Sequence, residues 1–363
     1  MYKRVGILTG GGDAPGLNAV IRSVVLTAYN CYGWEVIGIR QGYDGLLHAQ
    51  PPVVPLTPER VQPLLARGGT ILGAVNRGNP FIREVTNADG TVEYADVAPE
   101  AVARLAALNI DALIVAGGDG TMAIAHRLIE LGARIVGVPK TIDNDLAQTD
   151  VSFGFDTAIL TATEALDKLQ TTAESHHRVM VMEVMGRNSG WIALITGVAG
   201  GADVILVPEI PYNIDHVCRH LTESRTQDRN HALVVVAEGA ATIGGHQQYY
   251  IKGSSLMDAR LGGIGYSLGN SIAEKTGFDV RVLRLGHLQR GGAPTPRDRW
   301  LATRFGAAAV HLVARQQWGQ MVALHGTRIV AVPMAEAVKI KRVEPAGEMV
   351  QVARDVGISF GDK

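Results

Sequence analysis

The chain has 363 residues, of which 47% are hydrophobic, 19% are charged and 5% are aromatic, and its formal net charge at pH 7 is -1. This length exceeds what one hydrophobic core usually fills, so we expect two domains. The small net charge and the few aromatic side chains exclude a general binding surface for nucleic acid or anionic lipid, so any anion site must be local.

Short apolar runs alternate along the chain with longer helical stretches. In chain order, the runs that predict strands are Arg4 to Thr9, Glu35 to Ile39, Ala112 to Ala116, Arg134 to Pro139, Val179 to Val184, Val204 to Pro208, Ala232 to Ala237 and Val280 to Leu285. Most are continuously apolar, which is typical of parallel strands covered on both faces. Helical spacing of apolar residues is clearest in AIAHRLIELG, TAILTATEALDKLQ and DRWLATRFGAAAVHLVARQQ.

This alternation predicts an α/β protein with two doubly wound, Rossmann-like domains and largely parallel sheets. The stretch from Gln50 to Gly90 contains many prolines and glycines. We expect it to be irregular, with one short helix around Pro58 to Ala66.

Glycines gather after two of the predicted strands. The segment LTGGGDAPGLNAVIR places Gly10, Gly11 and Gly12 between a strand and a helix, and AGGDGTMAIA repeats the arrangement with Asp119 among its glycines. Such loops let backbone N–H groups and a helix N-terminus face a phosphate. Either loop alone is equally consistent with a tight strand-to-helix turn. Neither matches the Walker loop or the dinucleotide GxGxxG pattern.

A third loop, PKTIDND at 139 to 145, follows the apolar run RIVGVP. Phosphoryl transfer to an alcohol needs a base, a metal ion and cations near the moving group. Asp143 is our candidate base, Thr141 a group that orients phosphate, and Lys140 a cation for phosphate charge. The alternative is structural, since Asp and Asn after a strand also form turns and helix caps.

Further cations and polar groups follow later strands. Arg178 precedes one predicted strand and Met185, Gly186 and Arg187 follow it, while Glu238 follows another. The segment VRVLRLGHLQRGG supplies Arg281, Arg284, His287 and Arg290. Because arginine presents a fixed fork of donors, this segment predicts a sugar-phosphate site.

The motifs LTGGGDAPGLNAVIR, GGDGT, PKTIDND, MEVMGR and GHLQRGG, spread from 8 to 292, resemble the phosphofructokinase family. This resemblance implies Mg²⁺-dependent transfer of the ATP γ-phosphoryl group to the 1-hydroxyl of fructose 6-phosphate, a step of glycolysis. It also implies a homotetramer of two-domain subunits. The donor domain would be 1–153 plus 289–335, and the sugar-phosphate domain 154–288 plus 336–363.

The resemblance also assigns residues to the site. The implied catalytic residues are Asp143 as base, Thr141 and Arg187. The implied sugar-phosphate residues are Thr141, Asp143, Arg178, Met185, Gly186, Arg187, Glu238, Arg281, His287 and Arg290. The implied donor residues are Gly12, Tyr43, Arg77, Gly118, Asp119, Gly120, Thr121 and Lys140. Asp119 would be the Mg²⁺ ligand, and Arg178 and Arg281 would reach the sugar phosphate of a neighbouring subunit.

The donor and the class of protein have alternatives. In the family, pyrophosphate-dependent members typically carry Asp at the position of Gly120, which favours ATP here. Lysine at the position of Lys140 is usual among the pyrophosphate enzymes, so a pyrophosphate-dependent phosphotransferase is the alternative. GGDGT also occurs in NAD kinases and lipid kinases, although GHLQRGG speaks against them. A catalytically silent metabolite sensor is opposed by the presence of both Asp119 and Asp143.

We expect a cytoplasmic protein without nucleic-acid or membrane partners. Cys31 and Cys218 are far apart and match no metal or redox spacing, as is typical of a reducing compartment. The opening MYKRVGILTGGG does not resemble a signal peptide, and no apolar run approaches the roughly 20 residues of a membrane-spanning helix.

Overall fold

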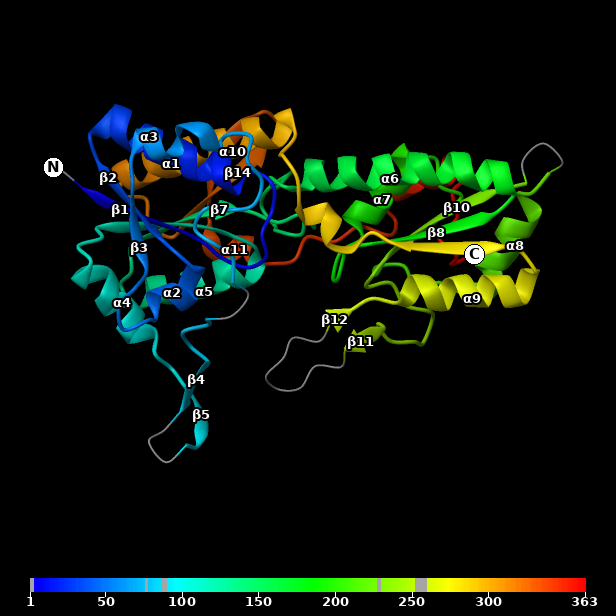
Figure 1. The fold of residues 1–363 in the computed structure, drawn as a ribbon, viewed down its shortest axis with the longest axis horizontal. Helices are drawn as coiled ribbons and strands as arrows, with labels where there is room; N and C mark the ends of the chain where they lie inside the picture. The colour runs from blue at the N-terminus through cyan, green and yellow to red at the C-terminus, as the bar shows by residue number, and fades with distance from the viewer. Residues whose placement is uncertain (1–2, 76–77, 87–89, 227–229, 252–259) are drawn as a thin grey trace. The chain divides into compact units, whose positions relative to one another are not determined.

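The computed structural model describes residues 3–75, 78–86, 90–226, 230–251 and 260–363 (Figure 1). The chain forms two compact units. Unit 1 comprises Met1–Ile142, Leu146–Thr157 and Arg290–Ile340, and unit 2 comprises Asp143–Asp145, Ala158–Gln289 and Lys341–Lys363. The predicted segment ends at 153, 288 and 335 lie a few residues before the observed ends at 157, 289 and 340. The grouping of 143–145 with unit 2 was not predicted.

Unit 1 is built on a seven-stranded sheet with the order β15-β14-β7-β6-β1-β2-β3. Its strands are β1 Arg4–Thr9, β2 Glu35–Ile39, β3 Val53–Leu56, β6 Ala112–Gly117, β7 Ile135–Pro139, β14 Gln320–His325 and β15 Arg328–Pro333. The pairs from β14 to β2 are parallel, whereas the edge strands β3 and β15 are antiparallel to their neighbours. The prediction of a largely parallel sheet is therefore confirmed.

Helices cover both faces of this sheet, because successive side chains of each strand point to opposite sides. Ile114 of β6 packs with α1 and α10, whereas Val115 packs with α2, α4, α5 and α11. The helices are α1 Leu17–Tyr32, α2 Gly42–Leu46, α3 Pro58–Val61, η1 Gln62–Leu64, α4 Ala98–Ala107, α5 Asp119–Glu130, α10 Pro296–Ala314 and α11 Met334–Ala337. Figure 1 shows α1 and α10 together on one side and α4 and α5 on the other.

Unit 2 contains a four-stranded parallel sheet with the order β13-β8-β10-β9. Its strands are β8 Val179–Val184, β9 Val204–Leu206, β10 Ala232–Ala237 and β13 Val280–Arg284. Helices α8 and α9 pack on one face, and α6 and α7 lie on the other (Figure 1). The helices are α6 Phe155–His176, which begins in unit 1, α7 Trp191–Ala199, α8 Ile214–Glu223, α9 Ile264–Thr276, η2 Gly286–Arg290 and α12 Glu348–Asp355.

The prediction for the Gln50 to Gly90 stretch is wrong in part. The short helix forms, as α3 and η1, but the stretch also holds β3 and the strand β4 Arg83–Thr86, which pairs with β5 Val92–Ala95. Pro55 lies within β3, where it is tolerated because β3 is an edge strand. A second small pair, β11 Tyr249–Ile251 with β12 Arg260–Leu261, was not predicted.

Candidate functional site

The first glycine loop lies beyond the carboxyl end of β1 and contacts the second loop closely. A Cβ atom on Gly10 would stand 2.6 Å from the Thr121 side chain, so only glycine fits at this position. The backbone N–H of Gly10 donates to the carbonyl oxygen of Ala116 at 2.9 Å. The carboxyl ends of β1 and β6 therefore present their glycine loops side by side, as ligand sites of open α/β sheets require.

The second loop leads into the N-terminus of α5. Gly118 is the N-cap, Asp119 is the first helical residue, and Gly120 follows on the exposed side. A Cβ atom on Gly120 would meet no atom within 4 Å. Buried Thr121 accepts a 3.1 Å hydrogen bond from the hydroxyl of Tyr43 at its carbonyl oxygen. Burial raises the pKa of Tyr43 well above its usual range, so its hydroxyl stays protonated and fixes the turn.

Asp119 is a suitable ligand for Mg²⁺. Its carboxylate is partly exposed at the start of α5, beside the glycines. Among the residues that the structure describes, no cluster of three or more His, Cys, Asp or Glu side chains could hold a metal ion. A single carboxylate such as that of Asp119 is compatible with Mg²⁺, which commonly binds through one or two carboxylates together with phosphate oxygens and water.

Two cations reach the first glycine loop from distant parts of unit 1. Lys140 directly follows β7, is 3% exposed, and donates from Nζ to the carbonyl oxygen of Gly12 at 2.5 Å. Arg290 donates from Nη1 to the carbonyl oxygen of Asp13 at 3.0 Å. A Cβ atom on Gly12 would stand 2.9 Å from that same nitrogen. The loop thus combines backbone N–H groups with an ammonium and a guanidinium, which suits a polyphosphate.

The structure divides the PKTIDND loop between the units. Thr141 belongs to unit 1 and is 8% exposed. Its carbonyl oxygen accepts a hydrogen bond from the hydroxyl of Ser152 at 2.7 Å. Asp143 belongs to unit 2, where its carbonyl oxygen accepts from the hydroxyl of Ser189 at 3.1 Å. Asp145 is held nearby, because its carbonyl oxygen accepts from the backbone N–H of Lys341 at 2.7 Å. The candidate base therefore belongs to the same unit as most of the predicted sugar-phosphate residues, whereas Thr141 and Arg290 belong to unit 1.

Several of these residues meet at the carboxyl ends of β8, β10 and β13. Gly186, at φ 137°, and Arg187 follow β8, and the carbonyl oxygen of Gly186 accepts from the backbone N–H of Gly239, the neighbour of Glu238. The side-chain amide of Gln247 donates to the carbonyl oxygens of Arg187 at 2.8 Å and Gly239 at 3.2 Å. These bonds join the loop after β8 to the loop after β10.

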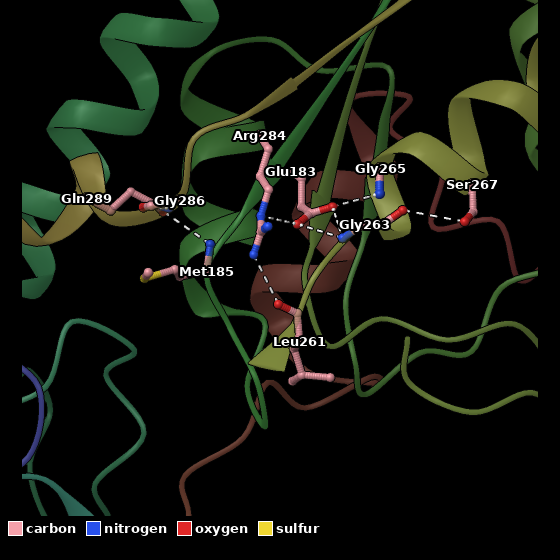
Figure 2. Close-up of polar contacts among 9 residues, drawn as sticks. All are labelled: Glu183, Met185, Leu261, Gly263, Gly265, Ser267, Arg284, Gly286 and Gln289. Carbon is pink, nitrogen blue, oxygen red and sulfur yellow. Dashed lines mark hydrogen bonds and ion pairs between the residues drawn. The ribbon is translucent and has the colours of Figure 1, made fainter. Parts of the chain in front are cut away.

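Gln289 joins the third strand end to this group. Its side chain is fully buried, its Oε1 accepts from the backbone N–H of Met185 at 3.3 Å, and its Nε2 donates to the carbonyl oxygen of Gly286 at 3.0 Å (Figure 2). Gly286 begins η2, which carries exposed His287. Met185, Arg187, Glu238 and His287 are thus brought to one end of the sheet.

Arg178 and Arg281 lie elsewhere. Arg178 precedes β8 and Arg281 is the second residue of β13, so both are near the amino ends of these strands. Asp279 accepts from both, from Arg178 Nε at 2.6 Å and from Arg281 Nη1. The Arg178 guanidinium holds the pKa of Asp279 below its usual range. Within one chain, these arginines are not assembled with Met185 and His287. Arg77 falls outside the described residues.

Sequence reasoning missed the residues that support the site. Gln289 lies within GHLQRGG, but nothing in that pattern shows that its amide spans two loops. Arg284 was grouped with the sugar-phosphate cations, yet its Nε lies 3.1 Å from Oε1 of Glu183. The available signal was Glu183 itself, an ionisable residue inside the apolar run VMVMEV, because a buried carboxylate requires partners.

Each unit is built on a largely parallel sheet with helices on both faces. One unit carries two adjacent glycine loops, and the other carries polar residues at the carboxyl ends of its strands. Together these features define a phosphate-binding α/β enzyme. The family model described as Phosphofructokinase matches residues 4–313. An ATP-dependent 6-phosphofructokinase of Chloroflexus aggregans is 53% identical over 99% of this chain and 98% of its own. The chain therefore belongs to the phosphofructokinase family.

Other members differ in the phosphoryl donor that their names give. A pyrophosphate–fructose 6-phosphate 1-phosphotransferase of Amycolatopsis methanolica is 51% identical over 94% of this chain and 96% of its own. Among solved structures, the phosphofructokinase of Saccharomyces cerevisiae has a TM-score of 0.77 and 30% identity. That match covers 93% of this chain and 45% of the yeast chain, so the present chain spans less than half the length of the yeast protein.

Proposed function

We propose that this protein is an ATP-dependent 6-phosphofructokinase, which transfers the γ-phosphoryl group of ATP to the 1-hydroxyl of fructose 6-phosphate in glycolysis. The observation that carries the proposal is the first glycine loop of unit 1, where Lys140 and Arg290 donate to the carbonyl oxygens of Gly12 and Asp13. The family match and the Chloroflexus relative support it. A cytoplasmic location belongs to the same proposal.

Unit 1 would hold the donor. The glycine loops would bind its phosphates through backbone N–H groups, and Lys140 would balance their charge. Asp119 would hold Mg²⁺, which would neutralise charge on the phosphate oxygens when bound. Gly120 supports ATP as the donor, because its side is exposed and leaves space for groups beyond the two phosphates of pyrophosphate.

Unit 2 would hold the acceptor. Met185, Arg187, Glu238 and His287 would orient the sugar phosphate, and Asp143 would accept the proton of the 1-hydroxyl as it attacks. Such positioning provides the largest gain available to phosphoryl transfer, whose transition state needs orientation and charge compensation more than covalent chemistry.

We further propose a homotetramer in which Arg178 and Arg281 complete the site of a neighbouring subunit. Their location at the amino ends of β8 and β13, away from Met185 and His287, supports this assignment. Light scattering of the purified protein tests the subunit number. A monomer with full activity would remove the role of both arginines between subunits.

Pyrophosphate is the second candidate donor. The buried ammonium of Lys140 at the glycine loop favours a compact, highly charged donor, and the Amycolatopsis relative carries the corresponding name. The deciding experiment measures fructose 1,6-bisphosphate formation from fructose 6-phosphate and Mg²⁺ with ATP or pyrophosphate in parallel. We expect kcat/KM for ATP to exceed that for pyrophosphate by at least about tenfold. Equal or faster turnover of pyrophosphate refutes the ATP assignment, and no product with either donor refutes the proposed function.

A further inference from the structure

Glu183 is a buried carboxylate in the middle of an otherwise apolar strand. It lies on β8, and its side chain is 2% exposed. Its Oε2 accepts from the backbone N–H groups of Gly265 at 2.8 Å and Gly263 at 3.0 Å. Gly263 is the N-cap of α9, so the carboxylate also faces the positive end of a helix. Several donors in fixed directions hold this side chain in one orientation.

Arg284 completes the arrangement from the neighbouring strand. It is in register with Glu183 across the β8–β13 pair, and its Nε lies 3.1 Å from Glu183 Oε1. Its Nη2 donates to the carbonyl oxygen of Leu261 at 3.1 Å. Figure 2 shows the Glu183 carboxylate between the Arg284 guanidinium and the backbone N–H groups of Gly263 and Gly265, in the segment 261–265 that leads into α9. We call Glu183, Arg284 and this segment the Glu183–Arg284 cluster.

The segment approaches so closely that one position excludes a side chain. Gly262 has φ 132°, and a Cβ atom there would stand 2.7 Å from Arg284 Cζ and 3.0 Å from Glu183 Oε1. At Gly263, by contrast, a Cβ atom would meet nothing within 4 Å. The close packing is therefore specific to the side of the loop that faces the ion pair.

The cluster lies just before the predicted acceptor residues on both strands. Glu183 precedes Met185 by two residues, and Arg284 precedes His287 by three. Gln289 then bonds to Met185 and Gly286 themselves (Figure 2). The two strands are thus cross-linked by polar side chains twice in succession, immediately before the residues proposed to bind the sugar phosphate.

We propose that Glu183 and Arg284 are positioning residues for the sugar-phosphate acceptor, an inference that rests on the proposed function. Stability alone is a poor reason for such a pair, because Glu183 is buried while the Arg284 side chain is 34% exposed, and well-packed apolar residues often stabilise such a site as well as or better than a buried charge with its partner. The pair instead makes hydrogen bonds in fixed directions. These bonds hold two backbone N–H groups and one carbonyl oxygen of the segment 261–265, and they hold the register between β8 and β13.

The test uses steady-state kinetics of the full-length protein with both substrates varied. Arg284→Met keeps an unbranched stem that reaches about as far as Nε but removes the donors to Glu183 and Leu261. Arg284→Lys keeps the charge without the guanidinium fork. Arg354→Met is the matched control, because Arg354 forms a partly buried, two-point ion pair with Asp362 in the same unit. That pair belongs to the chain end that bridges to β9, at the opposite edge of the sheet from β13.

We expect Arg284→Met to raise KM for fructose 6-phosphate by on the order of 10- to 100-fold, since small misplacements of binding groups have effects of this size. KM for the donor should change by less than about twofold, because the donor loops belong to unit 1. Arg284→Lys should recover part of the loss, and Arg354→Met should leave both KM values unchanged.

The outcomes separate the two proposals. A parent protein that forms no fructose 1,6-bisphosphate refutes the proposed function and, with it, this inference. An active parent with an unchanged fructose 6-phosphate KM in Arg284→Met refutes only the positioning role. A parallel rise in both KM values, or an equal effect of Arg354→Met, also refutes it, because either points to general loss of structure. Should Arg284→Met not fold, Arg284→Lys, which keeps the positive charge beside Glu183, is assayed with the same criteria.

Discussion

Asp298 provides a quantitative test of how burial controls charge in unit 1. It lies in the first turn of α10, is fully buried, and accepts at Oδ2 from the backbone N–H of Thr157 at 2.9 Å and from its hydroxyl at 2.6 Å. Burial outweighs these bonds and raises the pKa of Asp298 from its ordinary 3.8 to about 6. The folded protein therefore binds this proton more tightly than the unfolded chain does.

The direction of the pH effect follows from that difference. Stability falls as pH rises from about 3.8 to about 6, and the full penalty of about 3 kcal/mol is present above this range. About 1 kcal/mol of the penalty is already present at pH 4.5, so about 2 kcal/mol develops between pH 4.5 and 7.5. Asp298→Asn removes the charge, and its amide oxygen can still accept from Thr157.

We expect Asp298→Asn to gain stability relative to the parent by about 2 kcal/mol between pH 4.5 and 7.5. Urea unfolding at a fixed protein concentration measures the difference at each pH, since subunit association makes stability depend on concentration. Asp150→Asn, the same change at an exposed position of unit 1, is the control. It measures how far loss of an exposed carboxylate changes the free energy of unfolding over the same pH range. A constant difference between Asp298→Asn and the parent across this range would refute the reasoning.

The remaining predictions concern the proposed site. Asp143→Ser should lower kcat by about 10²- to 10⁴-fold with little change in KM for fructose 6-phosphate, because a proton acceptor is lost but the binding groups remain; near-normal kcat would exclude Asp143 as the base. Gly120→Asp should fold, since its side is open, and should reduce kcat/KM for ATP more than for pyrophosphate; equal losses would show that this position does not select the donor. Gln289→Met should lower the free energy of unfolding by about 1 to 3 kcal/mol, because the backbone groups of Met185 and Gly286 lose their partner; thermal melts matching the parent would contradict this.

Most parallel strands of both sheets could be predicted from the sequence, because burial on two faces leaves continuous apolar runs, although β14, which is parallel to β7, was not predicted. The run Ala112 to Ala116 became β6, which is buried along its whole length. The edge strands β3 and β15 of the unit 1 sheet could not be found in this way. Five of the six residues of β15 are exposed or partly exposed, so their pattern carries little of the signal of a buried strand.

Loops that bear glycine and carboxylate residues could also be predicted, since their composition reflects local backbone needs. The bonds that assemble them could not. Lys140 and Gly12 are separated by 128 positions and Arg290 and Asp13 by 277, and no local pattern encodes which carbonyl oxygen a distant cation will reach. The family resemblance assigned roles to these residues. The hydrogen bond from Arg290 to the first glycine loop, however, became visible only in the structure.

The order in which the chain builds unit 1 has a consequence for biosynthesis. The strand β14 pairs with β7, yet residues 158–289, which form most of unit 2, lie between them in the sequence. A ribosome makes the chain from its N-terminus. The outer edge of β7 therefore has no strand to pair with until β14 has emerged. Nascent chains halted before residue 320 should therefore expose an unpaired parallel edge, the kind of surface that recruits chaperones or a second unfinished copy.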